Sequence, residues 1–226
     1  MSATIHPLHG SGHLAQAAFA PEAAAEVLRE LRGLVMRGLG DRLGRMFSGA
    51  DDLLFDMSEK AQNNDQQRVY FDTMRALRLG RAKIAEQYET CIRESFDQQT
   101  GAPAEAETGA VDFDNLALLD SDELEESLAV ANMANKADNT CRNAMLELDR
   151  RFEWLSRHSP LKVSSQAIAP LGFCNAFRTS IKLLDTEFSI KLVLYKLYER
   201  LVLGDLMPLY AEILVLMDRM GVLSER

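Results

Sequence analysis

Apolar residues recur every three or four positions along most of the chain, which is the spacing of one face of an α-helix. The first such run follows Pro21 and includes Val27, Leu31, Leu34 and Val35. Alternating runs of β-branched residues, the pattern typical of strands, do not occur in the sequence. The pattern therefore predicts an all-α fold, a multi-helix bundle of about six to eight helices.

The predicted helices follow one another with short breaks. A first helix starts after Pro21 and continues to about Phe47, but its glycines predict a break near residues 38–40, since each costs up to about 1 kcal/mol inside a helix. Further helices are predicted over about 51–61, 65–96, 121–156, 170–184, 188–203 and 205–220. Apolar residues cover most of the circumference of 188–203, so we expect it to be the central helix.

Two segments lack this periodicity and predict the domain organisation. Residues 1–20 contain proline, glycine and three of the four histidines, and we interpret them as a flexible, disordered tail. Residues 98–117 form a predicted acidic and glycine-containing linker, because they have too little apolar surface to order themselves. The linker separates an amino-terminal helical part, 21–97, from a carboxy-terminal helical part, 118–226. We expect the two parts to pack together as one domain.

Charge and cysteine content restrict the possible partners and the compartment. The net charge of −9 argues against nucleic acid as a partner, because neutralising phosphates needs a basic face. Three widely spaced cysteines fit neither a disulfide framework nor a zinc site. No signal peptide and no uninterrupted apolar stretch of membrane-spanning length is recognisable. We therefore expect a cytoplasmic protein without a membrane partner.

A stripe of arginines is the first candidate binding feature. Arg75, Arg78 and Arg81 follow one another at a spacing of three and drift around the helix predicted over 65–96. Such a stripe could bind the phosphate groups of a nucleotide second messenger or an acidic partner. It could also be a solvated face that pairs with neighbouring carboxylates.

Arg81 raises a separate question, because it lies one turn from Leu77 and Ile84 within an apolar stripe. Burying an unpaired guanidinium costs roughly several kcal/mol, so the side chain must reach a carboxylate or extend to solvent. Asp56 or Asp52 of the preceding predicted helix is a plausible partner. We expect a buried ion pair between the two helices as the first interpretation and an anion site as the second.

A second polar group interrupts the helix predicted over 121–156. Asn135, Asp138 and Arg142 fall on the stripe whose apolar members run from Leu124 to Leu155. Asp138 and Arg142 are four residues apart and can pair within the helix. A kink, a buried polar network, a ligand pocket or a helix that leaves the core midway would each explain this pattern.

The sequence contains no recognisable catalytic or metal-binding motif. His6, His9 and His13 lie in the predicted tail without helical spacing, and His158 is placed to favour the carboxy-terminal end of a helix. No Glu-x-x-His pair, Gly-x-Ser-x-Gly turn, phosphate loop or Cys-x-x-Cys motif occurs. We expect no enzyme activity, no metal and no cofactor.

Three segments resemble, in order, the bacterial family of unknown function numbered 1631. They are MFSGADDLLFDMSEKAQNNDQQRVYFDTMRALRLGR at 46–81, LLDSDELEESLAVANMANKA at 118–137 and KLVLYKLYERLVLGDLMPLYAEILVLMDRMGVL at 191–223. The stretch IAPL at 168–171 departs from the family, in which Asn-Pro is expected. The resemblance implies a bacterial cytoplasmic origin and an amino-terminal region or a short member, but no activity. Some members carry a thymidine phosphorylase label, which no glycine-rich phosphate loop supports here.

These observations predict a non-catalytic helical interaction or regulatory module with a role in signalling. It presents an apolar groove or helix face to a protein partner or to a second copy of itself. The first alternative is a small-ligand sensor that uses Arg75, Arg78 and Arg81 to bind a nucleotide. The second is an enzyme with a carboxylate-based site at Asp138 or Asp56.

Overall fold

The computed structural model describes residues 19–100 and 121–223, and this part of the chain is helical without strands. The helices are α1 Pro21–Glu59, α2 Asn64–Thr100, α3 Ser121–His158, α4 Pro170–Ile181, α5 Phe188–Leu201 and α6 Leu206–Arg219. Short 3₁₀ segments precede α4 and α6, at Ser165–Ile168 and Leu203–Asp205. The predicted all-α fold is confirmed, with fewer helices than the pattern suggested because the first two predicted helices are one.

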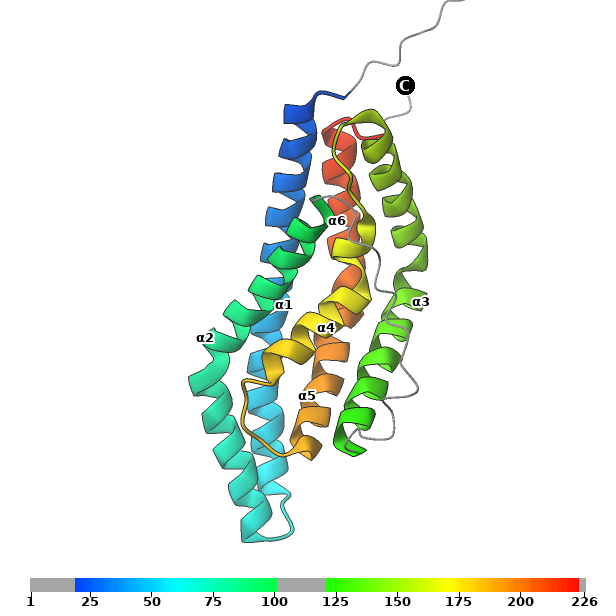
Figure 1. The fold of residues 1–226 in the computed structure, drawn as a ribbon. Helices are drawn as coiled ribbons and strands as arrows, with labels where there is room; N and C mark the ends of the chain where they lie inside the picture. The colour runs from blue at the N-terminus through cyan, green and yellow to red at the C-terminus, as the bar shows by residue number, and fades with distance from the viewer. Residues whose placement is uncertain (1–18, 101–120, 224–226) are drawn as a thin grey trace, which may run out of the picture.

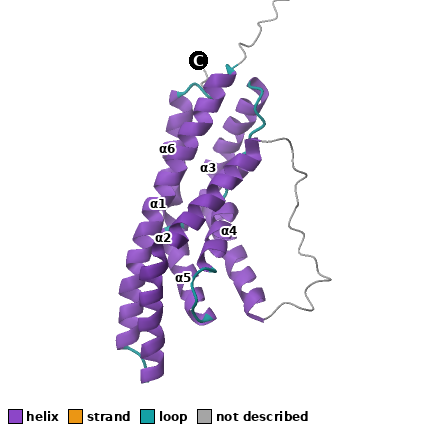
Figure 2. Ribbon diagram, turned by 60° about the vertical axis from the view of Figure 1, so that its left-hand side comes forward, coloured by secondary structure: helices purple, strands orange, loops and turns teal. Residues whose placement is uncertain are grey.

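The helices form a bundle with α4, α5 and α6 between two outer groups (Figure 1). On one side α1 and α2 form a long antiparallel pair, and on the other side lies α3 (Figures 1 and 2). Helices α5 and α6 follow each other end to end along α1, and both also pack against α3. Buried apolar residues from all six helices form one contiguous core.

The break predicted near residues 38–40 is wrong, and α1 continues without interruption through the segment 51–61. Two of its glycines lie where later helices approach closely. A Cβ atom on Gly38 would come within 2.7 Å of Leu209 Cδ1, and one on Gly49 within 3.0 Å of Leu201 Cδ1. The glycines therefore weaken the isolated helix but allow α6 and α5 to pack tightly against it.

The buried stripe predicted for α3 is confirmed at Leu148, Phe152 and Leu155 but is wrong in the preceding part of the helix. Asn135, Asp138 and Arg142 are exposed, and Leu124 and Leu128 are 43% and 54% exposed. The face that enters the core is built largely from smaller residues: Val130, Met133, Ala134, Ala137, Cys141 and Ala144, followed by Leu148, Phe152 and Leu155. The polar residues therefore point outward from a helix that stays on the core along its length.

Helix α5 lies in the middle layer, as expected for residues 188–203, but it is not buried all round. Ile190, Leu194, Tyr195, Leu197 and Tyr198 are buried, whereas Lys196 and Arg200 on the opposite face are exposed.

Most of the predicted tail and linker lies outside the described residues, as do His6, His9 and His13. Of the predicted linker, residues 98–100 extend α2. In the two described ranges, no helix combines the length and hydropathy needed to cross a membrane.

Candidate functional site

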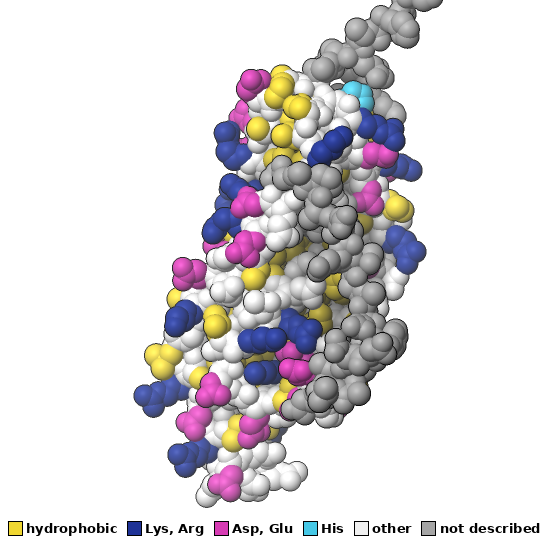
Figure 3. Space-filling view, viewed as in Figure 1, with side chains coloured by type: hydrophobic (Ala, Val, Ile, Leu, Met, Phe, Trp, Pro, Cys, Tyr) yellow, Lys and Arg dark blue, Asp and Glu magenta, His cyan; other side chains and the backbone are white. Residues whose placement is uncertain are grey.

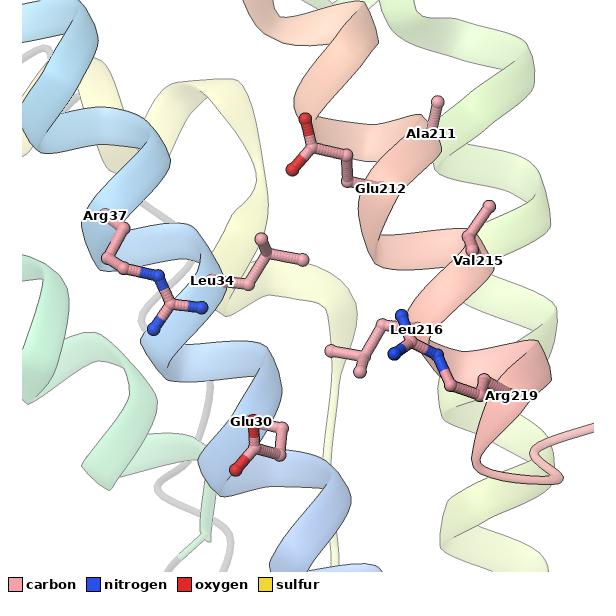
Figure 4. Close-up of a pocket in the computed structure, with 8 residues that line it drawn as sticks. All are labelled: Glu30, Leu34, Arg37, Ala211, Glu212, Val215, Leu216 and Arg219. Carbon is pink, nitrogen blue, oxygen red and sulfur yellow. The ribbon is translucent and has the colours of Figure 1, made fainter.

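An open groove with an apolar floor lies between α1 and α6 (Figure 4). Leu34 of α1 and Leu216 of α6 line it and are half-buried, and Val215 beside them is 59% exposed. The groove has a volume of about 420 Å³, within the range of sites that hold a small ligand or an inserted side chain. Its lining is completed by Glu30, Arg37, Ala211, Glu212 and Arg219.

Contacts at the amino-terminal end of α6 hold the two helices in this arrangement. The side chain of Leu209 packs directly on Gly38 of α1. Arg42, which is buried, donates hydrogen bonds to the carbonyl oxygens of Asp205 at 2.8 Å and Gly38 at 2.9 Å. Because these contacts fix α6 against α1, the groove is part of the rigid packing of the bundle.

Charged residues of alternating sign surround the apolar floor. Helices α1 and α6 run in opposite directions, so Arg37 and Glu212 lie at one end of the groove and Glu30 and Arg219 at the other (Figure 4). Among the described residues, no ion pair joins the charges of α1 to those of α6 across the groove; the contact found for Glu30 is with its neighbour Arg29, at 3.8 Å. The four charged side chains thus remain accessible around the floor.

The two walls of the groove share one sequence pattern. Residues 30–37 read ELRGLVMR and residues 212–219 read EILVLMDR, so Glu, Leu and Arg occupy the same three positions in each. Because the helices are antiparallel, the pattern gives the groove an approximate two-fold symmetry about an axis through its floor. The repeat is visible in the sequence, but only the packing of α1 against α6 brings its two copies together.

The three arginines of the predicted stripe do not converge on one point. Arg78 pairs with Asp51 of α1, with Nε 3.0 Å from Oδ1. Arg81 is exposed, donates to the carbonyl oxygen of Gly44 at 3.3 Å and lies over the ring of Phe47, 5.4 Å from its centroid. The predicted buried ion pair with Asp56 or Asp52 is therefore wrong: Asp56 is exposed as well, and the interhelical bond of Arg81 goes to a backbone oxygen.

The cavity beside these arginines is small. Arg78 and Arg81 line a space of about 90 Å³, well below the few hundred Å³ typical of small-molecule pockets. Arg75 is exposed and does not line it. Over α2, acidic and basic side chains are interspersed rather than gathered into one basic patch (Figure 3).

A buried polar cluster exists elsewhere, around Glu126 in the second turn of α3. Arg178 of α4 donates from Nε to one carboxylate oxygen at 3.0 Å, and the hydroxyl of Tyr195 on α5 donates to the other at 2.7 Å. Arg178 also donates to the hydroxyl of Ser127 at 3.0 Å. Burial and the bond to Glu126 raise the pKa of Tyr195 well above its usual value. This cluster ties three helices together.

The carboxylates proposed for catalysis, Asp56 on α1 and Asp138 on α3, are both exposed and come from different helices. Asp138 is exposed, and partial desolvation raises the pKa of its carboxyl against the opposing effect of Arg142. Within the described ranges, no group of three or more His, Cys, Asp or Glu residues could hold a metal ion. His158 stacks on Trp154 with ring centroids 4.3 Å apart, at the carboxy-terminal end of α3.

Comparison with known proteins identifies the family. A family model described as "Protein of unknown function (DUF1631) N-terminal domain" matches residues 23–221. No curated protein and no solved structure matches the chain. The match covers all six helices of the bundle and confirms the resemblance seen in the three sequence segments. The chain belongs to the DUF1631 family and contains its N-terminal domain.

Proposed function

We propose that this domain is a non-catalytic interaction module that binds a protein through the groove between α1 and α6. The observation that carries the proposal is the half-buried apolar floor of Leu34 and Leu216, surrounded by charged side chains that are not paired across the groove, with the exposed Val215 beside it on α6. The three free cysteines fit a reducing compartment such as the bacterial cytoplasm. In that setting the module would act as a regulatory or signalling domain.

The geometry suits a helical binding partner. Grooves between packed helices accept the side-chain ridges of another helix, with apolar residues inserted and charged residues at the rim. Leu34, Leu216 and Val215 offer the apolar contact, and charges of both signs on each wall can select the orientation of the partner. An interaction surface with this division between an apolar centre and a polar rim is typical of specific protein contacts.

The two alternative functions have weaker support. A nucleotide sensor built on Arg75, Arg78 and Arg81 would need a site for phosphate groups, but Arg78 already pairs with Asp51 and the adjacent cavity is about 90 Å³. An enzyme built on Asp138 would need a cleft that excludes water, whereas this side chain stands on the exposed face of α3.

Site-specific photo-crosslinking in cells tests the proposal. A photoreactive amino acid in place of Val215 is expected to give a discrete adduct, because this exposed side chain lines the groove and would contact the partner. The matched control replaces Leu146, which is 53% exposed on α3 and does not line the groove. The Glu212→Arg substitution should reduce the adduct at position 215. Equal adduct patterns at both positions, or none at 215, would count against the proposal.

A further inference from the structure

We propose that the partner in the groove between α1 and α6 is a second copy of this chain, related by a two-fold axis. This inference rests on the proposed function and adds the identity of the occupant. It follows from the distribution of charge around the groove, which is complementary to itself.

The four charges form a pattern of alternating sign. Going around the floor, Glu30 of α1 is followed by Arg219 of α6, then Glu212 of α6, then Arg37 of α1 (Figure 4). These four side chains are the corners of the groove, and each has a neighbour of opposite sign along its own helix and another across the groove.

A two-fold rotation about an axis in the plane of the interface brings each corner over one of its neighbours. With the axis parallel to the helices, Glu30 of one copy faces Arg219 of the other, and Arg37 faces Glu212. With the axis across the helices, Glu30 faces Arg37 and Glu212 faces Arg219. In both arrangements all four contacts join opposite charges, as a symmetric interface between identical surfaces requires.

The apolar part of the surface is suited to the same arrangement. Met207, Ala211 and Val215 are exposed at a spacing of four along α6, with Met207 42% and Val215 59% exposed. Residues spaced by four form a ridge on a helix surface, and such a ridge can pack beside the same ridge of a second helix. Contact between the two copies would remove Val215 from water and cover Leu34 and Leu216.

Sedimentation velocity and light scattering over a range of concentrations test for this dimer. The chain is expected to approach twice its 25.3 kDa mass as concentration rises. Val215→Glu should raise the dissociation constant at least about tenfold, since a carboxylate would be desolvated beside Glu212. Leu146→Glu, at a position of similar exposure on α3, should leave the dissociation constant unchanged. A wild-type chain that stays monomeric at every concentration overturns the proposal.

Inverting the charge pattern provides a sharper test. Glu212→Arg alone should weaken the dimer, because an arginine then faces an arginine of the other copy in either arrangement. The fourfold variant Glu30→Arg, Arg37→Glu, Glu212→Arg and Arg219→Glu restores alternation with all signs reversed. It should associate with itself but not with the wild type, while circular dichroism shows an unchanged helical fold. Free mixing of the two proteins overturns the proposal.

Failure of this inference and failure of the proposed function are distinguishable. If the crosslinker at position 215 captures a product whose mass is not that of two copies, the groove is an interaction surface but its occupant is a different protein. If position 215 gives no specific adduct and the chain is monomeric, both the proposed function and the dimer proposal are wrong.

Discussion

Glu126 shows how a single polar residue can organise the packing of several helices. Its carboxylate is buried, and the side chains that bond to it come from α4 and α5. A buried carboxylate is tolerated only when its oxygens are bonded and its charge is compensated. The Arg178 guanidinium and the Tyr195 hydroxyl meet both conditions, so removing Glu126 would leave a cation and a hydroxyl without their partner.

We therefore expect Glu126→Ala to lower the free energy of unfolding by about 2–3 kcal/mol. Breaking a buried ion pair costs roughly 3–5 kcal/mol. The loss expected for Glu126→Ala is at or below the lower end of that range, because Arg178 is 28% exposed and can be partly hydrated. Urea denaturation followed by circular dichroism measures the change. The adjacent Glu125→Ala, at an exposed position, should change stability by less than about 0.5 kcal/mol. Equal effects of the two substitutions would show that the cluster does not stabilise the fold.

At the residue scale, the sequence pattern does not identify the buried charge. Arg81, which is expected to be buried, is exposed, whereas Glu126, which is buried, is not among the predicted site residues. Arg81 lies within the predicted apolar stripe, and the first interpretation is a buried ion pair with Asp56 or Asp52, with extension toward solvent as the way to avoid burial. The guanidinium is exposed and bonds to the carbonyl oxygen of Gly44. Which oxygen it reaches depends on the relative position of α1 and α2, which no local pattern encodes.

The glycines of α1 show a conflict between helix propensity and packing at the scale of one element. Propensity alone predicts an interruption near residues 38–40, yet the helix is continuous through Glu59. Most of the stability of a helix in a protein comes from the apolar face that it buries. At Gly38 the absence of a side chain permits the contact with Leu209, so the residue that weakens the helix also allows its packing.

Two alanine substitutions separate these effects. Gly38→Ala should destabilise the protein by about 1–2 kcal/mol, because its Cβ would lie 2.7 Å from Leu209 Cδ1 and overpacking outweighs the gain in propensity. Gly40→Ala, whose nearest contact would be Glu89 Oε1 at 4.0 Å, should stabilise it by up to about 1 kcal/mol. Thermal and urea denaturation measure both. Stabilisation by both variants would refute the close-packing explanation.

Helix α3 shows why periodicity can predict an element correctly and its orientation incorrectly. Its extent, Ser121–His158, agrees with the predicted 121–156. The predicted stripe runs from Leu124 to Leu155, and its last members, from Leu148 on, are buried. Leu124 and Leu128 are exposed, and in that part of the helix a face rich in alanine is buried instead. Alanine contributes little to a hydrophobic pattern, yet it allows helices to approach closely. Orientation was thus determined by packing distance rather than by residue hydrophobicity.

On the scale of the whole molecule, the sequence predicted the all-α bundle and most helix limits, but not the groove. The sequence predicts a helix over 205–220 and an apolar groove or helix face for a partner, without placing that groove. The groove requires α6 to lie antiparallel to α1, almost two hundred residues earlier in the chain, so that Leu34 and Leu216 meet. Such a pairing is a property of the tertiary arrangement. The shared spacing of Glu, Leu and Arg predicts a groove only once α1 and α6 are known to pack together.

Four buried tyrosines link the layers of the bundle. The hydroxyl groups of Tyr88 on α2 and Tyr198 on α5 are 2.9 Å apart, and Tyr198 donates to the carbonyl oxygen of Phe173 on α4 at 3.0 Å. Tyr210 of α6 donates to the carbonyl oxygen of Ile168 at 2.8 Å, and Tyr195 to Glu126. Burial is the largest cause that raises the pKa of each hydroxyl well above its usual value.

We therefore expect the protein to unfold cooperatively as pH rises above about 10. In the unfolded chain the tyrosines lose their protons near pH 10, whereas the folded protein retains them. The stabilising contribution is fully present below pH 10 and is lost as pH rises toward the folded pKa values. In this range each tyrosine lowers the free energy of unfolding by about 1.4 kcal/mol per pH unit, so the four together lower it by up to roughly 5 kcal/mol per unit. Tyrosinate absorbance and circular dichroism should change together. Tyr210→Phe, which removes one titrating group, should reduce the slope by about a quarter; stability that does not change between about pH 9 and pH 11 would contradict the ionisation argument.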